Sequence, residues 1–291
     1  MSPLNNHCVS IVIPTIKNED DLNRIKVSLL QQTRPADEVI VVNDDERRGA
    51  AWARNKGIAQ SKGDLIAFLD DDCLPPKNWL ESLINAIDSY QADGAGGTYE
   101  ETDSLLIDRR KRQNFPDVEM EDTLGLVGAG GNLMFTRAWL NGCIETDGYV
   151  FNEAFRISQD WELIIRSRQR GIKLIYIPVR VKHLKKMKVS AYLRQQFGRG
   201  KGIAMLYQLQ KTSSASLTSH KSLLWGEGRG KHKKGANWLK ALWKKGFGPF
   251  DISSFDRKGD FVVFWIGEKI QGLGFLWHLI NRRKKSVVDN L

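Results

Sequence analysis

Gly63-Asp-Leu-Ile-Ala-Phe-Leu-Asp-Asp-Asp72 joins a short apolar run to three adjacent carboxylates. The run Leu65–Leu69 is typical of a strand that is buried on both faces of a sheet. Because alternate side chains of an extended segment share a face, Asp70 and Asp72 can approach one hard divalent cation together. The alternative is a solvated acidic turn before Pro75-Pro76. The position directly after a buried strand favours the binding site.

Two similar apolar runs come earlier in the chain, at Val9–Pro14 and Val39–Val42. Apolar residues recur at helical spacing between residues 22 and 29, and an Ala-rich stretch covers residues 50–59. Apolar strands that alternate with helices predict βαβ units and a mainly parallel sheet covered on both faces. In such sheets ligands bind beyond the carboxyl ends of the strands, so the loops at those ends are the candidate site.

Two charged residues near these loops have alternative interpretations. Asp44 follows the second strand and can accept hydrogen bonds from a base or ribose, but a lone Asp there is also a common helix cap. Arg54 can face an anion, or it can be a solvated residue of the Ala-rich helix.

The remaining sequence predicts a few further elements. Strands are expected at Gly94–Thr98, Leu133–Thr136 and Lys173–Ile177, and a helix at about 160–170. Residues 99–123 are polar and irregular and are predicted to form a long loop. The Ser/Thr-rich stretch Thr212–Ser219 predicts a linker.

Charge divides the chain into two parts. The net charge is +10, yet residues 1–184 hold 22 Lys/Arg and 28 Asp/Glu, whereas residues 185–291 hold 22 and 6. This asymmetry predicts an anionic partner for the C-terminal part: a phospholipid surface, a lipid diphosphate or nucleic acid.

The cysteines and the first ten residues indicate the cellular compartment in which the protein is expected. Cys8, Cys73 and Cys143 are odd in number and are not spaced as metal-binding pairs, so neither a disulfide framework nor a zinc site is predicted. The opening MSPLNNHCVS lacks the basic start and apolar run of a secretion signal. We therefore expect a cytoplasmic protein.

Seven stretches of the chain, followed by His183, form a recognisable order: Val9–Thr15, Glu38–Asp45, Gly49–Asn55, Gly63–Asp72, Gly130–Arg137, Gln159–Leu163 and Gly171–Pro178. Together they resemble the family 2 glycosyltransferases of the GT-A fold. The likeness covers about residues 9–184. Its joint specificity is high, although each stretch alone is weak.

The resemblance implies a fold and a domain plan. The fold is α/β, with a Rossmann-like mixed, mainly parallel sheet sandwiched by helices, and with a basic, mostly helical C-terminal extension. We expect a catalytic domain at residues 1–210, with a nucleotide-binding half at about 1–100 and an acceptor half at about 100–210. The extension covers residues 211–291.

The resemblance also implies a reaction. One sugar leaves a nucleoside-diphosphate sugar, for which a UDP-sugar is favoured, and joins a saccharide or lipid-linked acceptor with inversion at the anomeric carbon. Mn²⁺ or Mg²⁺ is the implied cofactor. Only part of the signature of processive synthases is present, as Gln196-Phe-Gly-Arg-Gly200 without its Trp, so addition of a single sugar is favoured over polymerisation.

The resemblance assigns roles to individual residues. Asp160 matches the base, while Asp70, Asp72 and His183 match the metal site. From its position alone, Asp160 is more typical of a helix N-terminal carboxylate than of a base. His183 fits an ordinary strand-end residue equally well. The residues implied around the nucleotide are Pro14, Thr15, Asp44, Arg54, Asp70 and Asp71, and those implied more weakly near the sugar or acceptor are Gly131, Asn132, Trp161 and Glu162.

The C-terminal segment Phe261–Ile280 is apolar but contains charged residues. Because a charge at the centre of a spanning helix costs about 2.5–3.5 kcal/mol, a helix lying on the membrane surface is predicted instead. Trp265 and Trp277 suit the headgroup zone and Arg282–Lys285 suits anionic lipids. The alternative is a helix packed on the fold. We expect a protein that is peripheral to the inner face of the membrane.

Two other functions compete with this prediction. The basic, aromatic tail also fits a non-enzymatic binder of nucleic acid or of another anionic surface, but no nucleic-acid motif is present and none is expected as a partner. A nucleotidyltransferase also uses carboxylate-held metal on an α/β sheet. Its Gly-rich, lysine-containing phosphate loop is missing after the first strand, where Thr15-Ile-Lys-Asn18 stands.

Overall fold

The structure, a computed structural model, describes residues 7–18, 22–103, 115–122, 126–212 and 258–288. It divides into two compact units. The first comprises residues 1–103 and 113–185, and the second residues 104–112 and 186–291. The boundary expected at residue 210 falls inside a helix of the second unit, α7 (Val189–Thr212).

The first unit is built on one mixed sheet in the order β2-β1-β3-β7-β5-β8-β4, with β6 paired to β8. β1 is parallel to β2 and β3, and β5 is parallel to β8, whereas β7, β4 and β6 are antiparallel to their neighbours. The strands are β1 (Val9–Thr15), β2 (Glu38–Asn43), β3 (Leu65–Phe68), β4 (Cys73–Leu74), β5 (Gly94–Glu101), β6 (Met120–Glu121), β7 (Leu133–Thr136) and β8 (Leu174–His183).

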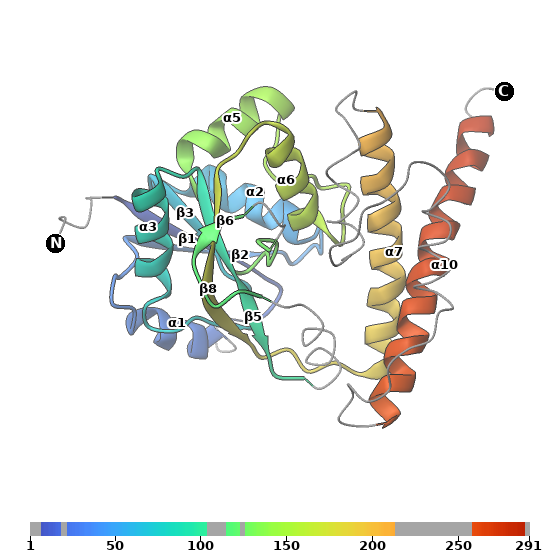
Figure 1. Cartoon of the computed structure of the whole chain (residues 1–291), viewed down its shortest axis with the longest axis horizontal. Coiled ribbons are helices and arrows are strands. Elements are labelled where there is room, and N and C mark those ends of the chain that lie inside the picture. The colour runs from blue at the N-terminus through green and yellow to red at the C-terminus, as the bar shows by residue number, and fades with distance from the viewer. Residues whose placement is uncertain (1–6, 19–21, 104–114, 123–125, 213–257, 289–291) are drawn as a thin grey trace. The chain divides into compact units, whose positions relative to one another are not determined.

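Helices cover both faces of this sheet (Figure 1). α1 (Asn23–Leu30) and α3 (Trp79–Tyr90) pack on one face, and α2 (Ala50–Gln60), α5 (Arg137–Asp147) and α6 (Gln159–Gln169) pack on the other. The alternation of side chains along β1 explains this, because Ile11 enters the first core and Val12 the second. The apolar runs of β1 and β3 are therefore central strands buried on both sides, whereas β2 is an edge strand in which Val39 and Val41 are exposed.

The structure confirms the strands predicted from apolar runs and the helix predicted at about 160–170. One prediction was wrong at its edges. Residues 99–101 were assigned to a long loop, but β5 continues to Glu101 because it pairs with β8, where Glu101 lies opposite His183. β6 also lies in the stretch that was predicted to be loop. Long-range pairing thus overrides a polar local sequence.

The second unit contains two long helices, α7 and α10 (Lys258–Val288), which run side by side in the same direction (Figure 1). The helix predicted at residues 261–280 is therefore present. The expected linker lies almost wholly outside the described residues. Within the described ranges, no helix is long and apolar enough to cross a membrane.

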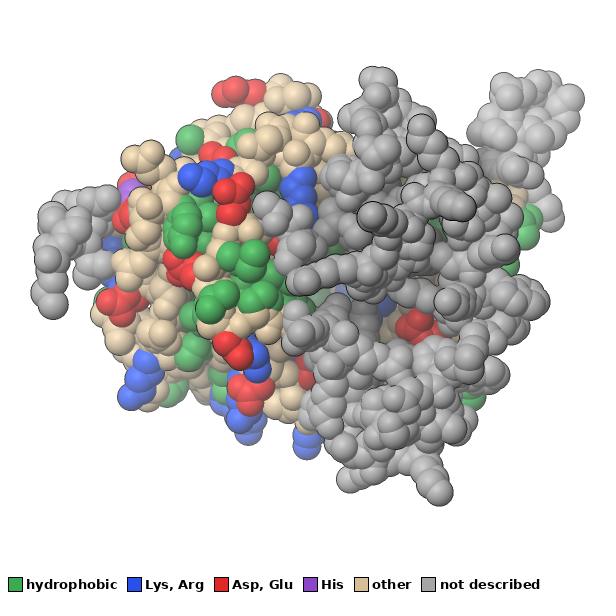
Figure 2. All heavy atoms as spheres, in the orientation of Figure 1, with side chains coloured by type: hydrophobic (Ala, Val, Ile, Leu, Met, Phe, Trp, Pro, Cys, Tyr) green, Lys and Arg blue, Asp and Glu red, His purple; other side chains and the backbone are tan. Residues whose placement is uncertain are grey.

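The visible surface of the first unit carries acidic, basic and hydrophobic side chains interspersed (Figure 2). This mixture agrees with the near balance of charges in residues 1–184. The basic excess of the chain therefore belongs to the sequence after residue 184.

Candidate functional site

The predicted nucleotide-binding residues gather at one edge of the sheet. The parallel register places Thr15 opposite Asn43, and Val12 opposite Phe68, so the loops after β1, β2 and β3 begin at the same edge. Asp44 follows β2 directly, and the three carboxylates follow β3. The carboxyl ends of the parallel strands thus form the candidate site, as the sequence predicted.

Asp72 and His183 meet because β4 pairs antiparallel with β8, with Cys73 opposite His183. Nε2 of His183 lies 3.3 Å from Oδ2 of Asp72, and Nδ1 lies 2.6 Å from Oε2 of Glu101. Among the residues that the structure describes, Asp72, Cys73 and His183 are the group whose ligand atoms all lie within 4.8 Å of one another. This cluster is the candidate metal site.

The donor set of the cluster suits a divalent cation. Histidines that bind metals usually donate their second ring nitrogen to a carboxylate, and Glu101 occupies that place beside His183. Burial and the carboxylates of Asp70 and Asp72 raise the pKa of the Cys73 thiol well above its ordinary value. Carboxylate oxygens suit Mg²⁺ and Mn²⁺, whereas thiols suit softer metals, so Asp72 with the neighbouring His183 forms the candidate ligand set.

Electrostatics couple the same groups. Burial lowers the pKa of His183, but hydrogen bonds and charge from Asp72 and Glu101 outweigh it and raise that pKa to about 9. Burial alone would raise the pKa of Asp72. The hydrogen bond and charge of His183, together with two nearby lysines, outweigh burial and lower that pKa. The carboxylate is thus ionised around neutral pH. A cation held by Asp72 and His183 would take the place of the imidazole proton.

Asp70, the first of the three adjacent carboxylates, is held by the side chains of Arg54 and Tyr99. Nη2 of Arg54 lies 2.5 Å from Oδ1 of Asp70, and the hydroxyl of Tyr99 donates to Oδ2 at 2.9 Å. Arg54 is buried, and its Nε and Nη1 have no hydrogen-bond partner within the described part of the chain. A buried cation with unused donors suits a phosphate group, which supports the prediction that Arg54 lies near the nucleotide.

Tyr99 is a site residue that the sequence analysis missed. Besides bonding Asp70, its hydroxyl accepts from the backbone N–H of Gly131 at 2.6 Å, and its ring stacks on His183 with centroids 4.9 Å apart. A Cβ at Gly131 would lie 2.7 Å from the backbone nitrogen of Asp70, so the loop needs glycine there. Tyr99 therefore fixes Asp70 and His183 relative to each other.

Replacing Tyr99 with Phe is expected to lower kcat/KM for the sugar donor by about 10- to 100-fold, because Asp70 loses a buried hydrogen bond and the Gly131 N–H loses its acceptor. Steady-state kinetics with varied donor measures this. Tyr90→Phe, at the end of α3, is the matched control and should keep normal kinetics. Equal kinetics for the two variants would show that the Tyr99 hydroxyl does not position the site.

Thr15, Asp71 and Asp44, which are also predicted near the nucleotide, form hydrogen bonds within the loops at this edge of the sheet. Thr15 Oγ1 donates to Asp71 at 2.6 Å, and Lys17 Nζ lies 3.1 Å from the same carboxylate, which joins the end of β1 to the acidic turn. Asp44 accepts from the backbone N–H groups of Arg48 at 2.8 Å and Gly49 at 2.6 Å. Pro14 is buried within β1. These bonds shape the loops at the edge where the nucleotide is predicted to bind.

Asp160 is the second residue of α6, in line with the helical N-terminal position seen in the sequence. Its Oδ1 accepts from the backbone N–H of Trp161 at 2.9 Å, and its Oδ2 accepts from that of Gly130 at 3.2 Å. Burial raises the pKa of Asp160, and the nearby charge of Arg54 partly offsets this. A carboxylate with a raised pKa is a stronger base than a free one.

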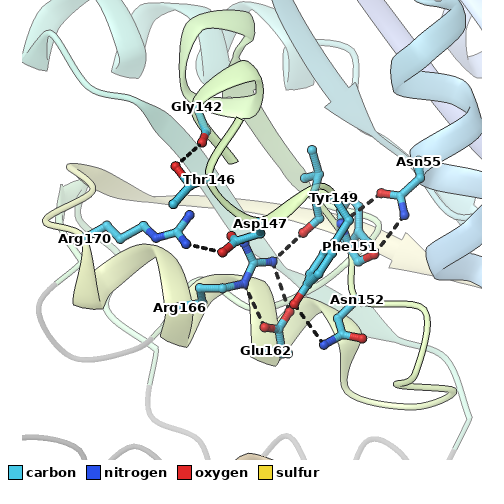
Figure 3. Close-up of polar contacts among 11 residues, drawn as sticks. Asn55, Gly142, Thr146, Asp147, Tyr149, Phe151, Asn152, Glu162, Arg166 and Arg170 are labelled. Atoms are coloured by element: carbon cyan, nitrogen blue, oxygen red, sulfur yellow. Dashed lines mark hydrogen bonds and ion pairs between the residues drawn. The ribbon is translucent and has the colours of Figure 1, made fainter. Parts of the chain in front are cut away.

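A network of ion pairs anchors the helix that carries Asp160 (Figure 3). Arg166 contacts Glu162 at 2.8 Å and Asp147 at 2.5 Å, and its Nη2 donates to the carbonyl of Val150 at 2.5 Å. Asn55 of α2 brackets the backbone of Phe151, donating to its carbonyl at 2.8 Å and accepting from its N–H at 2.9 Å. α6 is thereby tied to the preceding loop and to α5.

Arg166→Met is expected to destabilise the first unit by about 3–5 kcal/mol, because it leaves the buried carboxylate of Glu162 unpaired. Denaturant unfolding measures this loss. Arg180→Met is the control, since Arg180 and Asp117 form an exposed pair that contributes at most about 1 kcal/mol. Equal stability of the two variants would contradict an anchoring role for Arg166.

The residues implied near the sugar or acceptor lie in different surroundings. Asn132 is buried and bonds the carbonyls of Thr98 and Val179 and the indole of Trp79, and Glu162 is buried against Arg166. Both side chains are thus occupied in holding the fold. Trp161 is only partly buried. Gly131, through its N–H to Tyr99, shapes the loop beside Asp70.

A helix-covered mixed sheet, an Asp-x-Asp turn at the carboxyl end of a central strand and a separate carboxylate on a nearby helix define a glycosyltransferase domain of the GT-A fold. Residues 45–143 match the model of Glycosyl transferase family 2. This match covers about a third of the chain, and together with the fold it supports a family 2 glycosyltransferase.

Comparisons with known proteins agree with the assignment. The chain is 31% identical over 121 residues to Glycosyltransferase AglE of Haloferax volcanii, covering 32% of this chain and 40% of that one. It is 30% identical over 91 residues to the glucosyl-dolichyl phosphate glucuronosyltransferase of the same organism, covering 31% and 28%. The crystal structure of S. aureus TarS 1-349 has the same fold, with a TM-score of 0.53, 14% identity, and coverage of 95% and 91%. The matches thus span less than half the length of these two curated relatives.

Proposed function

We propose that the protein is a metal-dependent inverting glycosyltransferase that moves one sugar from a nucleoside-diphosphate sugar, for which a UDP-sugar is favoured, to a hydroxyl acceptor. The single observation that carries the proposal is the arrangement around Arg54. This buried cation bonds Asp70 and acts electrostatically on Asp160, so the acidic turn and the candidate base border one site.

Inverting transfer is a displacement at the anomeric carbon, and each part of it needs a different group. The attacking hydroxyl must lose its proton, and Asp160 is a carboxylate with a raised pKa that can accept it. The leaving diphosphate gains negative charge. Arg54 offers buried donors to it, and Asp72 and His183 would hold a divalent cation, which supplies further charge stabilisation when bound. Asp70, fixed by Tyr99, would complete this wall of the site.

The acceptor is proposed to be a saccharide or a lipid-linked glycan of the kind used in cell-envelope or polysaccharide synthesis. Two observations support the lipid-linked form. One relative is named for transfer to glucosyl-dolichyl phosphate. The sequence after residue 184 has 16 more basic than acidic residues, which suits a peripheral position on the inner face of the membrane.

The test is a panel of nucleotide sugars with Mn²⁺ and with membrane lipid extracts as the acceptor source. We expect release of a nucleoside diphosphate from one donor, and loss of that release when a chelator is added. A nucleotidyltransferase would release pyrophosphate instead. A simple binder of nucleic acid or of anionic surfaces would turn over none of the donors.

A further inference from the structure

α10 packs on α7 through small residues. A Cβ on Gly274 would lie 2.1 Å from the carbonyl oxygen of Phe197, and one on Gly200 would lie 1.9 Å from that of Gln271. On the same side of α10, Phe275 is 3% exposed. Glycine therefore lets the two helix backbones approach closely, and one face of α10 is committed to this contact.

A different face of α10 is apolar and open. Its residues are Ile266, Leu273, Leu276, Trp277 and Ile280, which are 37%, 58%, 48%, 47% and 56% exposed. We call these five residues the α10 stripe. They recur at spacings of three, four and seven residues, so they share one side of the helix. A helix in water gains nothing from such a stripe, because exposed leucines and tryptophan cost free energy there.

Basic residues border the α10 stripe. Nζ of Lys201 on α7 lies 3.9 Å from the ring centroid of Trp277, which places a cation at the aromatic end of the stripe. The sequence continues after Asn281 with Arg282-Arg-Lys-Lys285. An apolar helical face with an interfacial tryptophan and neighbouring cations has the chemistry of a segment that lies in the headgroup region of a bilayer.

We infer that the α10 stripe is the surface by which this protein contacts an anionic phospholipid membrane. The inference rests on the proposed membrane position and gives it a named surface. The stripe enters the boundary between headgroups and acyl chains, while Lys201 and the basic residues that follow the stripe meet the lipid phosphates. The opposite face keeps α10 on α7. Packing on α7 and contact with the membrane are therefore properties of two faces of the same helix.

The test is co-sedimentation of the full chain with phosphatidylcholine vesicles that contain about 30% phosphatidylglycerol, at low and at high salt. We expect binding that weakens steeply with salt and leaves a remnant from the apolar stripe. The double variant Leu273→Glu/Ile280→Glu should bind at least about tenfold more weakly at low salt and should lose the remnant. Leu30→Glu is the matched control, because Leu30 is an exposed leucine of α1 in the first unit and should bind as the wild type does.

Four results would overturn the inference. Three are absence of vesicle binding by the wild-type chain at low salt, equal binding by the double variant, and a preference for RNA over vesicles at the same salt. The fourth is a change in oligomeric state caused by the double variant, which would assign the stripe to a contact between copies. The assay needs neither donor nor metal, so its failure would leave the proposed transfer reaction untouched. Thermal unfolding of the double variant, compared with that of the wild type, shows separately whether the fold survives.

Discussion

Asp72→Asn is expected to lower sugar transfer by about 100- to 1,000-fold while the fold survives. The amide keeps the size of the carboxylate but loses the charge that attracts a divalent cation and pairs with His183 at 3.3 Å. Mn²⁺ affinity should fall together with transfer, since both depend on the same oxygen. Metal titration by calorimetry and steady-state turnover measure the two effects.

The matched control for this variant is Asp117→Asn, which removes a carboxylate from an exposed surface pair. It should leave turnover and metal affinity unchanged. Addition of a chelator to the wild-type protein should reproduce the loss. An Asp72→Asn protein that is fully active and resistant to the chelator would remove Asp72 from the metal site.

Asp160→Asn is expected to reduce kcat by about 100- to 10,000-fold, because the acceptor hydroxyl loses its base. Donor and metal binding should stay near normal, since the amide oxygen can still accept from the Gly130 N–H. Binding titrations and single-turnover transfer separate these effects. If the variant loses donor binding as severely as Asp72→Asn does, Asp160 is not acting only as a base.

The pH dependence of the wild-type protein provides a second test of the same residue. A base works in its deprotonated form, so kcat should fall as the pH drops through the pKa of Asp160. Because burial raises that pKa, the acidic limb should lie above the ordinary range of an aspartate, which is about 4. The limb should be missing from the residual activity of Asp160→Asn.

The central strands could be predicted from sequence because their apolar runs are strong local signals. Val9–Thr15 and Leu65–Phe68 are buried along their whole length, and no polar alternation obscures them. The end of β5 could not be predicted in this way. Tyr99–Glu101 was assigned to a loop, and it becomes strand only because β8, about 80 residues away, pairs with it.

In the candidate site too, the residues with a strong local signal could be predicted, and those placed by strand pairing could not. Asp70, Asp71 and Asp72 stand out as three adjacent carboxylates after a strand, and recognising them needs no long-range information. Tyr99 and Glu101 escaped prediction because their contacts with Asp70 and His183 arise from strand pairing. The alternation of Tyr99 and Glu101 on one side of an extended segment was the only available signal.

Asn132 shows the limit of motif transfer. The family resemblance suggested it as a sugar or acceptor contact, yet the structure buries it completely and uses its amide to bond two carbonyls and an indole. A short motif fixes which residues lie near a site. It does not separate those that touch a ligand from those that hold the loop in place.

The most direct test of the central claim, metal-dependent sugar transfer, is a mass balance in one reaction. The nucleotide sugar that the donor panel selects is labelled in both its sugar and its nucleotide. It is incubated with the acceptor and Mn²⁺, and the labelled products are separated and counted. We predict equal amounts of glycosylated acceptor and nucleoside diphosphate, with neither product formed in the presence of chelator. Equal product formation in the presence and absence of chelator, or release of a nucleoside monophosphate without sugar transfer, would contradict metal-dependent sugar transfer.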